Sequence, residues 1–416
     1  MPKYFPIKTA TACQLKWTWS TLFLNDGTTS SCHRVGRHQV ALEDFDNFHN
    51  TPMKIDQRNT MLEGKWPQPL PYMQDDEGCR YCQKIEEAGG QSDRMYHIQI
   101  PDLSPPELEY DPLATNVTPR ILEVFLSNTC NLSCTYCNAY NSSKIEYENK
   151  KFGVFEKNGL KLDILNIDRN KNKEYIERFF TWLETHSGTL RRLHLLGGEP
   201  LYQKEFVRCL NFFETHPNPQ LELNVITNLM IDADKLTAFV EQWRNMIATR
   251  KIKRFDITVS LDCWGEEQEY ARTGLKMDVI ERNMEILLKQ PWLYININSM
   301  LSPLTIRTFP DLVAKINTWK KIKKIDHCLG KVFSPDYHNP DIFGPDFWQE
   351  DFNRALDIMP QDSWQEKNVY QYLQGMVAQV QKTCRKPELI VKLQTHLDEL
   401  DRRRGTNWKK LFSYVV

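Results

Sequence analysis

Three cysteines near the middle of the chain have a spacing that suits an iron–sulfur cluster. Cys130, Cys134 and Cys137 stand in the segment SNTCNLSCTYCN, which is a CxxxCxxC pattern. Three thiolates bind three irons of a [4Fe–4S] cubane, so the fourth iron has no protein ligand and can chelate a small molecule through an amine and a carboxylate. The alternatives are a zinc site and three unrelated thiols. Zinc would want a fourth ligand, but residues 138–177 contain no Cys or His.

Four more cysteines, nearer the start of the chain, form a second candidate metal site. Cys13 and Cys32 flank a predicted hairpin whose turn is Asn25-Asp26-Gly27, and Cys79 and Cys82 make a CxxC pair. Four thiolates of this kind bind either zinc or an iron–sulfur cluster. The residues alone therefore leave the metal at this second site open.

The composition is that of a globular protein without a strong electrostatic preference. Of its 416 residues, 41% are hydrophobic and 11% aromatic, which is enough for real cores. Its 53 basic and 54 acidic side chains leave a net charge of −1, which gives no overall field toward nucleic acid or membrane. No apolar run has the length of a membrane helix, and residues 1–10 lack the apolar core of a signal peptide. We therefore expect a cytoplasmic protein with no nucleic-acid or membrane partner, whose cysteines bind metals, react or pack rather than form disulfides.

The chain divides into four predicted parts. The first part is rich in Trp, Cys and Gly and has few periodic helical stretches, so a metal would stabilise its limited core. Residues 101–119 contain five prolines and little periodicity, which predicts an extended linker. The predicted boundaries are 1–104 for the cysteine-rich domain, 105–118 for the linker, 119–330 for the main domain and 331–416 for a helical extension.

Strand and helix patterns alternate through the main domain. Six strand-and-helix units in a row predict a parallel sheet covered by helices, because parallel strands need crossover connections. The predicted fold class is α/β, a partial (β/α)6 barrel with the small N-terminal domain and the C-terminal helical extension attached to it. The predicted strands are 121–126, 192–197, 221–227, 255–261, 293–299 and 323–330, the helices between them are 172–186, 203–214, 233–248, 277–289 and 309–320, and the extension has helices at 348–358, 364–382 and 387–403.

Alternating side chains in two of these strands predict a polar interior. In FDITVSLD the apolar Phe255, Ile257 and Val259 alternate with the polar Thr258 and Ser260, and LYININSM repeats the pattern. One face of each strand would pack on helices while the other lines a polar lumen. Ligands of such barrels bind at the C-terminal ends of the strands, which is also where the CxxxCxxC segment stands.

With an aromatic residue, Tyr136, before its last cysteine, the CxxxCxxC segment resembles the signature of the radical S-adenosylmethionine (SAM) superfamily. The resemblance spans residues 119–330. It implies that Cys130, Cys134 and Cys137 hold a [4Fe–4S] cluster with an open iron site. It also implies that SAM binds at that iron and that its reductive cleavage gives a 5′-deoxyadenosyl radical. An electron donor such as flavodoxin or ferredoxin would supply the electron.

The same resemblance implies the contacts to SAM. Gly197-Gly198-Glu199-Pro200 looks like the family's GGE motif, which binds the methionyl amino group, since glycines permit close backbone approach and a carboxylate accepts from an ammonium. Polar residues at later strand ends look like ribose contacts, Arg272 like a partner of the SAM carboxylate, and Asn298 like a neighbour of the adenine. Ordinary strand-end polar residues and a simple salt bridge are the alternatives. The implied SAM-binding residues are Tyr136, Gly197, Gly198, Glu199, Thr227, Asn228, Ser260, Asp262, Arg272 and Asn298.

The N-terminal cysteines resemble the auxiliary-cluster domains called SPASM and twitch. The shared features are the region around Trp17, the Asp-Gly turn, and a CxxC pair followed by the acidic helix KIEEAGG. In most relatives this domain follows the barrel, whereas here it precedes it, and four cysteines match the one-cluster twitch form. The resemblance implies a second, electron-transferring [4Fe–4S] cluster, with zinc or no metal as the alternatives. Its ligands would be Cys13, Cys32, Cys79 and Cys82.

Relatives with auxiliary domains often modify peptides, which implies that the substrate is a ribosomally made peptide, oxidised or crosslinked after hydrogen abstraction. A small-molecule or nucleotide-derived substrate is the alternative, and a non-enzymatic metal-binding interaction protein is a remote one. Cys263 and Cys328 stand near predicted strand ends, where either would face the cavity as a radical relay or hydrogen donor, or else be a small buried residue. Cys209 is expected in the core.

Overall fold

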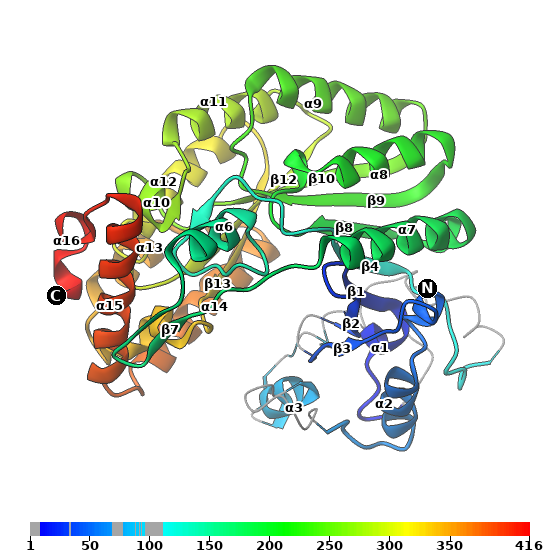
Figure 1. The fold of residues 1–416 in the computed structure, drawn as a ribbon, viewed down its shortest axis with the longest axis horizontal. Coiled ribbons are helices and arrows are strands. Elements are labelled where there is room, and N and C mark those ends of the chain that lie inside the picture. Colours follow the sequence, from blue (N-terminus) through cyan, green and yellow to red (C-terminus); the bar gives the residue numbers. More distant parts are fainter. Residues whose placement is uncertain are drawn as a thin grey trace.

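A nine-stranded sheet runs through the computed structural model, which describes residues 9–32, 35–68, 78–87, 89–90, 92, 94–95 and 111–416. The strands lie in the order β13-β12-β10-β9-β8-β4-β1-β2-β3, and helices flank the sheet (Figure 1). The architecture is mixed α/β, with a large parallel sheet and many helices. In the described residues the edge strands β13 and β3 do not pair with each other, so the sheet is open there.

Six neighbouring strands are parallel and follow the order of the chain. Each hydrogen-bonds to the next, and helices make the crossovers that parallel strands need. The six strands are β4 (Ile121–Phe125), β8 (Arg192–Leu196), β9 (Asn218–Thr227), β10 (Ile252–Ser260), β12 (Tyr294–Leu301) and β13 (Ile325–Lys331). The crossover helices are α7 (Arg169–His186), α8 (Lys204–Thr215), α9 (Ala233–Ala248), α11 (Met277–Leu288) and α12 (Phe309–Lys320). These elements confirm the predicted strands and helices, with ends that differ by three residues at most.

The main core lies between this sheet and the crossover helices. Phe255, Ile257 and Val259 of β10 have no exposed surface, and the Trp243 ring of α9 stacks on Phe255 at a centroid distance of 4.1 Å. The alternation in FDITVSLD therefore predicted the face of β10 that packs on the helices.

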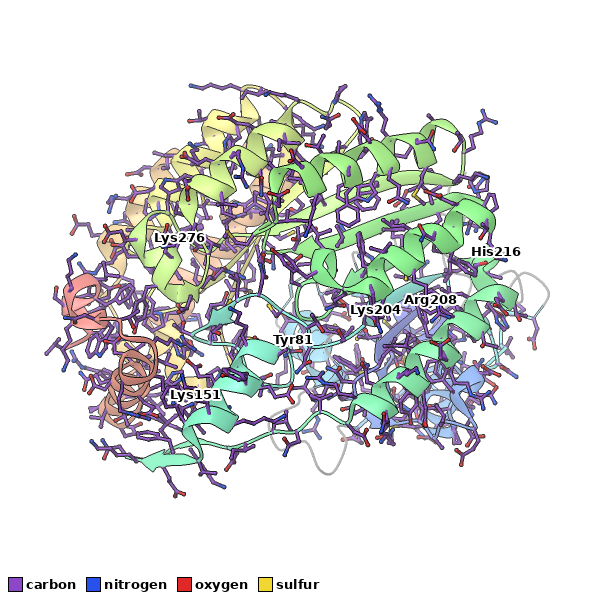
Figure 2. All side chains as sticks on the ribbon, turned by 45° about the horizontal axis from the view of Figure 1, so that its top comes forward. Tyr81, Lys151, Lys204, Arg208, His216 and Lys276 are labelled. Atoms are coloured by element: carbon purple, nitrogen blue, oxygen red, sulfur yellow. The ribbon has the colours of Figure 1, made fainter. Side chains whose placement is uncertain are left out.

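Neighbouring crossover helices also contact one another through charged side chains. Arg208 on α8, labelled in Figure 2, donates from its two Nη atoms to the Glu177 carboxylate on α7 at 2.7 and 2.9 Å. Exposed pairs of this kind contribute only ~0.2–1 kcal/mol, so burial of the apolar core is the larger stabilising effect.

The N-terminal region is joined to the main sheet. The predicted turn is present, because β1 (Trp19–Phe23) and β2 (Thr28–Ser30) pair antiparallel across Asn25-Asp26-Gly27. β1 also pairs in parallel with β4, so the sheet continues without a break into this region. Its other elements are α1 (Gln14–Thr18), β3 (His38–Gln39), α2 (Pro52–Leu62) and α3 (Cys79–Glu87). Of the predicted linker, residues 105–110 lie outside the described residues, and residues 111–118 contain no helix or strand.

The C-terminal extension contains the three predicted helices and packs on the main domain. Its last long helix, α15 (Pro387–Arg404), contacts α6 (Ser143–Phe152). Arg404 on α15 donates from Nε and Nη2 to the carboxylate of Glu148 on α6 at 2.9 and 2.8 Å. Figure 1 places α15 and α16 at the end of the molecule opposite α1 and α2. The helices are α13 (Gln349–Ile358), α14 (Trp364–Val380), α15 (Pro387–Arg404) and α16 (Trp408–Leu411).

Every helix in the described part of the chain is too short or too polar to span a bilayer.

Replacing Gly27 tests the packing of the N-terminal hairpin against α7. Its φ is +74°, and a Cβ there would stand 2.0 Å from the Tyr175 ring. Gly64 has the same φ of +74° but nothing within 4 Å of such a Cβ. We expect Gly64→Ala to cost about 1–2 kcal/mol from the left-handed backbone alone, and Gly27→Ala clearly more because the Tyr175 ring must move. Urea denaturation of both variants measures the difference in the free energy of unfolding. Equal losses would contradict the docking.

Candidate cluster and cofactor site

The three central cysteines occupy the loop that directly follows β4. Cys134 belongs to the short strand β5 (Ser133–Cys134), which pairs antiparallel with β11 (Arg272–Thr273), so Arg272 stands opposite Cys134. At the other side of the loop, the backbone N–H of Cys130 donates to Ser143 Oγ at 3.1 Å, at the start of α6. The loop is therefore fixed by two separate elements, while its three thiols stay partly exposed.

Burial dominates the chemistry of these thiols. Desolvation raises the pKa of Cys130 and of Cys137 to about 12, with a further contribution from the Cys134 sulfur, and it raises the pKa of Cys134 as well. The thiols are therefore protonated in the metal-free protein at neutral pH, and metal binding would release protons. In the described ranges, no three His, Cys, Asp or Glu side chains are grouped as ligands of a single metal ion. A cubane takes one thiolate at each of several corners, and a set of three sulfur donors in one loop fits that chemistry.

The predicted Gly197-Gly198 pair brings the turn after β8 into contact with the segment that leads into Cys130. The N–H of Gly198 donates to the carbonyl of Ser127 at 2.8 Å. A Cβ on Gly197 would stand 2.5 Å from that carbonyl oxygen, and a Cβ on Gly198 would stand 2.3 Å from the carbonyl oxygen of Thr129. Both positions thus require glycine, because any side chain there would clash with the backbone of the segment that leads into Cys130.

Glu199 is buried and already accepts hydrogen bonds from this chain. Thr227 Oγ1 donates to Oε1 at 2.7 Å, the backbone N–H of Asn228 donates to Oε2 at 2.6 Å, and the N–H of Leu201 donates to Oε1 at 3.1 Å. Only 1% of the Glu199 surface is exposed, and burial raises its pKa to about 7 despite these donors. Three predicted SAM-binding residues, Glu199, Thr227 and Asn228, are thereby brought into one contact group beside Cys130.

Asp262 is the centre of a second contact group. Tyr136 Oη donates to Oδ2 at 2.6 Å, and Arg272 donates through Nε and Nη2 to the two carboxylate oxygens at 2.8 and 2.9 Å. The backbone N–H of Met300 donates to Oδ1 at 2.9 Å. Arg272 thus forms a salt bridge with Asp262. This salt bridge is the alternative that the sequence left open beside a contact between Arg272 and the SAM carboxylate. Burial raises the pKa of Tyr136, so its hydroxyl keeps the proton that it donates.

Two further predicted residues lie together at the C-terminal ends of their strands. Ser260 on β10 stands opposite Asn298 on β12, and Asn298 stands opposite Cys328 on β13. Cys328 is exposed, and Asn296 Nδ2 lies 3.5 Å from its sulfur. Cys263, in contrast, is fully buried, like Cys209 in the core. Of the two cysteines predicted near the cavity, Cys328 is therefore the accessible one.

One group beside the cysteine loop was not predicted. His338 Nε2 lies 3.2 Å from His396 Nδ1, and the His338 ring meets the Tyr136 ring edge-on at a centroid distance of 6.4 Å. Both histidines are buried, and desolvation lowers the pKa of His338 to about 3. No motif spacing marks this pair, because its members are brought together by the C-terminal extension.

The four N-terminal cysteines line one cavity. Cys13 precedes α1, Cys32 follows β2, and Cys79 and Cys82 stand one turn apart on α3. Burial raises the pKa of Cys13, and the sulfurs of the other three cysteines raise it further. The four cysteines thus share the lining of one cavity, although in the described residues they are not grouped as ligands of a single metal ion. Four soft sulfur donors would suit either zinc or an iron–sulfur cluster.

The Glu199 carboxyl gives the metal-free protein a pH dependence. Its pKa is about 7 in the folded state against 4.5 for an ordinary Glu, so the folded state binds more protons between these values and stability falls as pH rises through them. We expect Glu199→Gln to remove this fall, measured by urea denaturation across that pH range. Glu241→Gln, at an exposed position on α9, should keep the wild-type slope. If the stability of Glu199→Gln falls with pH as steeply as that of the wild type, Glu199 is not the group that titrates in this range.

No protein-family model and no curated protein matches the chain. Among solved structures, a histidine-tagged anSMEcpe with bound AdoMet is 18% identical at a TM-score of 0.35, over 62% of this chain and 58% of that chain. Native anSMEcpe with bound AdoMet and Cp18Cys peptide is 19% identical at a TM-score of 0.35, over 62% and 60%. The chain thus spans about three fifths of the length of these structures. A likeness of this size establishes neither the family nor the activity of this chain.

Proposed function

We propose that this protein is a radical SAM enzyme built on a partial (β/α)6 barrel. One observation carries the proposal: the CxxxCxxC loop, the Gly-Gly-Glu turn and polar strand residues meet toward the C-terminal edge of the six parallel strands from β4 to β13. In parallel α/β sheets this edge is where ligands bind.

The cluster, when bound by Cys130, Cys134 and Cys137, would supply the electron that cleaves SAM to a 5′-deoxyadenosyl radical. The chain's own residues would bind SAM and orient it. Glu199, held in place by Thr227, Asn228 and Leu201, would offer its one remaining lone pair, on Oε2, to an ammonium. Ser260 and Asn298, which are paired across β10 and β12, would offer a hydroxyl and an amide to the sugar and base.

The second site would hold an auxiliary [4Fe–4S] cluster of the twitch type. All four of its ligands are supplied by the protein, so electron transfer fits this site better than direct binding of substrate. Zinc is the rival metal for the same four thiolates.

The proposed substrate is a ribosomally made peptide, which would be oxidised or crosslinked. An open groove of about 1740 Å³ between α3 and the C-terminal extension is larger than the ~300–1,000 Å³ typical of small-molecule pockets, which is compatible with a peptide. Its aromatic lining includes Tyr81 on the helix that carries Cys79 and Cys82 (Figure 2), together with Phe333, Tyr337 and Tyr372. A small-molecule or nucleotide-derived substrate is the alternative, and flavodoxin or ferredoxin is the proposed electron donor.

Replacing Cys134 tests the radical-generating site. We expect Cys134→Ala to abolish 5′-deoxyadenosine formation from SAM by the dithionite-reduced protein, because one iron loses its only protein ligand. Chromatography of the quenched reaction measures the product. Cys209→Ala, at a fully buried position on α8, is the matched control and should retain formation. Retained formation in Cys134→Ala would refute the assignment.

Replacing Cys79 tests the auxiliary site. We expect Cys79→Ala to lower the iron content of the anaerobically reconstituted protein by about four per chain, if the site holds a cubane. Iron, sulfide and zinc analysis of wild type and variant measures this. A loss of zinc with an unchanged iron content would instead favour zinc at this site.

A further inference from the structure

Three cationic side chains are buried together in the N-terminal region. Lys16 on α1 is 2% exposed, and Lys54 and Arg58 on α2 are 1% and 0% exposed. Charged groups are rarely buried so completely, because leaving water is costly unless an opposite charge is present. An uncompensated group of three therefore needs an explanation.

In the described structure the three cations donate only to neutral acceptors. None of them forms an ion pair with a carboxylate in the described ranges. The acceptors are Gln57 Oε1 for Lys16 (2.5 Å), Ser20 Oγ and Thr29 Oγ1 for Lys54 (2.8 Å each), and Asn50 Oδ1 with the carbonyls of Lys16, His49 and Thr115 for Arg58. The three cations thus have hydrogen-bond acceptors, but none of these acceptors in the described residues carries a negative charge.

Three other buried cations in the described residues have carboxylate partners. Arg272 pairs with Asp262, and Lys331 donates to Asp341 Oδ2 at 2.5 Å although only 2% of it is exposed. Arg94, beside the four cysteines, pairs with Glu86. The group of Lys16, Lys54 and Arg58 therefore differs from these three cations.

The missing negative charge is available at the neighbouring cysteines. Lys16 lines the same cavity as Cys13, Cys32, Cys79 and Cys82. Electrostatic interactions also join Lys16 to Cys13 and Lys54 to Cys32. Protonated thiols are neutral, but four thiolates around Zn²⁺ or an oxidised [4Fe–4S] core leave a net charge of about −2 at the site.

We propose that Lys16 and Lys54, with Arg58 next to them, form the built-in counter-charge of a net-negative four-thiolate metal centre at Cys13, Cys32, Cys79 and Cys82. The inference rests on the proposed auxiliary site and adds a role for residues that are not its ligands. Two consequences follow. Metal binding relieves the uncompensated positive charge, and nearby cations favour the reduced form of a redox-active cluster, which raises its reduction potential.

The first consequence is measured as the difference in Tm between the metal-loaded and the metal-free full-length protein. Lys54→Met should narrow this difference, because the metal-free variant carries one fewer uncompensated charge. Lys331→Met is the matched control: this lysine is equally buried but has its own carboxylate partner, so both forms should lose stability together. Lys16→Met provides a second variant at the site. An unchanged difference in both Lys54→Met and Lys16→Met would overturn the proposal.

The second consequence is measured in full-length protein in which Cys130, Cys134 and Cys137 are Ala, so that the auxiliary centre is the remaining proposed cluster. Lys54→Met should make the reduced cluster about tenfold less populated at a fixed potential, a shift of about −60 mV for a one-electron couple. A redox titration followed by electron paramagnetic resonance gives the potential. If this background binds neither iron nor zinc, the auxiliary site itself fails and the inference with it. If metal binds and both the potential and the Tm difference stay at wild-type values, the counter-charge alone is refuted.

Discussion

The Asp262 carboxylate, with no exposed surface, holds together the elements that surround the cysteine loop. Its donors are the Tyr136 hydroxyl, the Arg272 guanidinium and the Met300 N–H, which come from the loop itself, from β11 and from β12. Removing one partner of such a buried pair typically costs about 3–5 kcal/mol. The position of the loop that would carry a cluster therefore depends on this one carboxylate more than on any surface contact.

The turn after β8 fixes the same loop from the opposite side. Gly197 and Gly198 allow backbone approach that a Cβ would prevent, and Glu199 then joins this turn to the end of β9. Both sets of contacts are made by the chain's own buried residues, which hold the loop in one position from two sides. The two candidate metal sites differ in their charges. Near Cys134 the buried Arg272 is neutralised by Asp262, whereas the buried Lys16 near Cys13 has no carboxylate partner in the described residues.

Much of the fold follows from local pattern. The strand at Phe255 and the helix at 233–248 show clean periodicity, and both are present where the periodicity predicts them. What the pattern does not contain is the identity of distant partners. β1 pairs in parallel with β4, about a hundred residues further along the chain. The backbone hydrogen bonds that join the two strands do not depend on residue type, so the sequence does not predict this pairing.

The candidate site shows the same limit. The motif positions of Glu199, Asp262 and Arg272 are readable in the sequence, but their mutual contacts are not. Arg272 pairs with Asp262 because β11 turns it back toward the strand end, and His338 reaches Tyr136 only through the packing of the C-terminal extension. Residue type and spacing thus predict which side chains carry the chemistry, while long-range packing decides what each one touches in the unliganded protein.

The central claim is that one cluster iron is left without a protein ligand so that SAM can bind there. Electron–nuclear double resonance on the reduced, reconstituted protein, with SAM carrying ¹⁵N in its methionyl amine, tests it most directly. If SAM binds that iron through its amine, the spectrum will show a hyperfine coupling between that nitrogen and the cluster. The absence of such a coupling, or a coupling to a nitrogen of a protein side chain in its place, would contradict it.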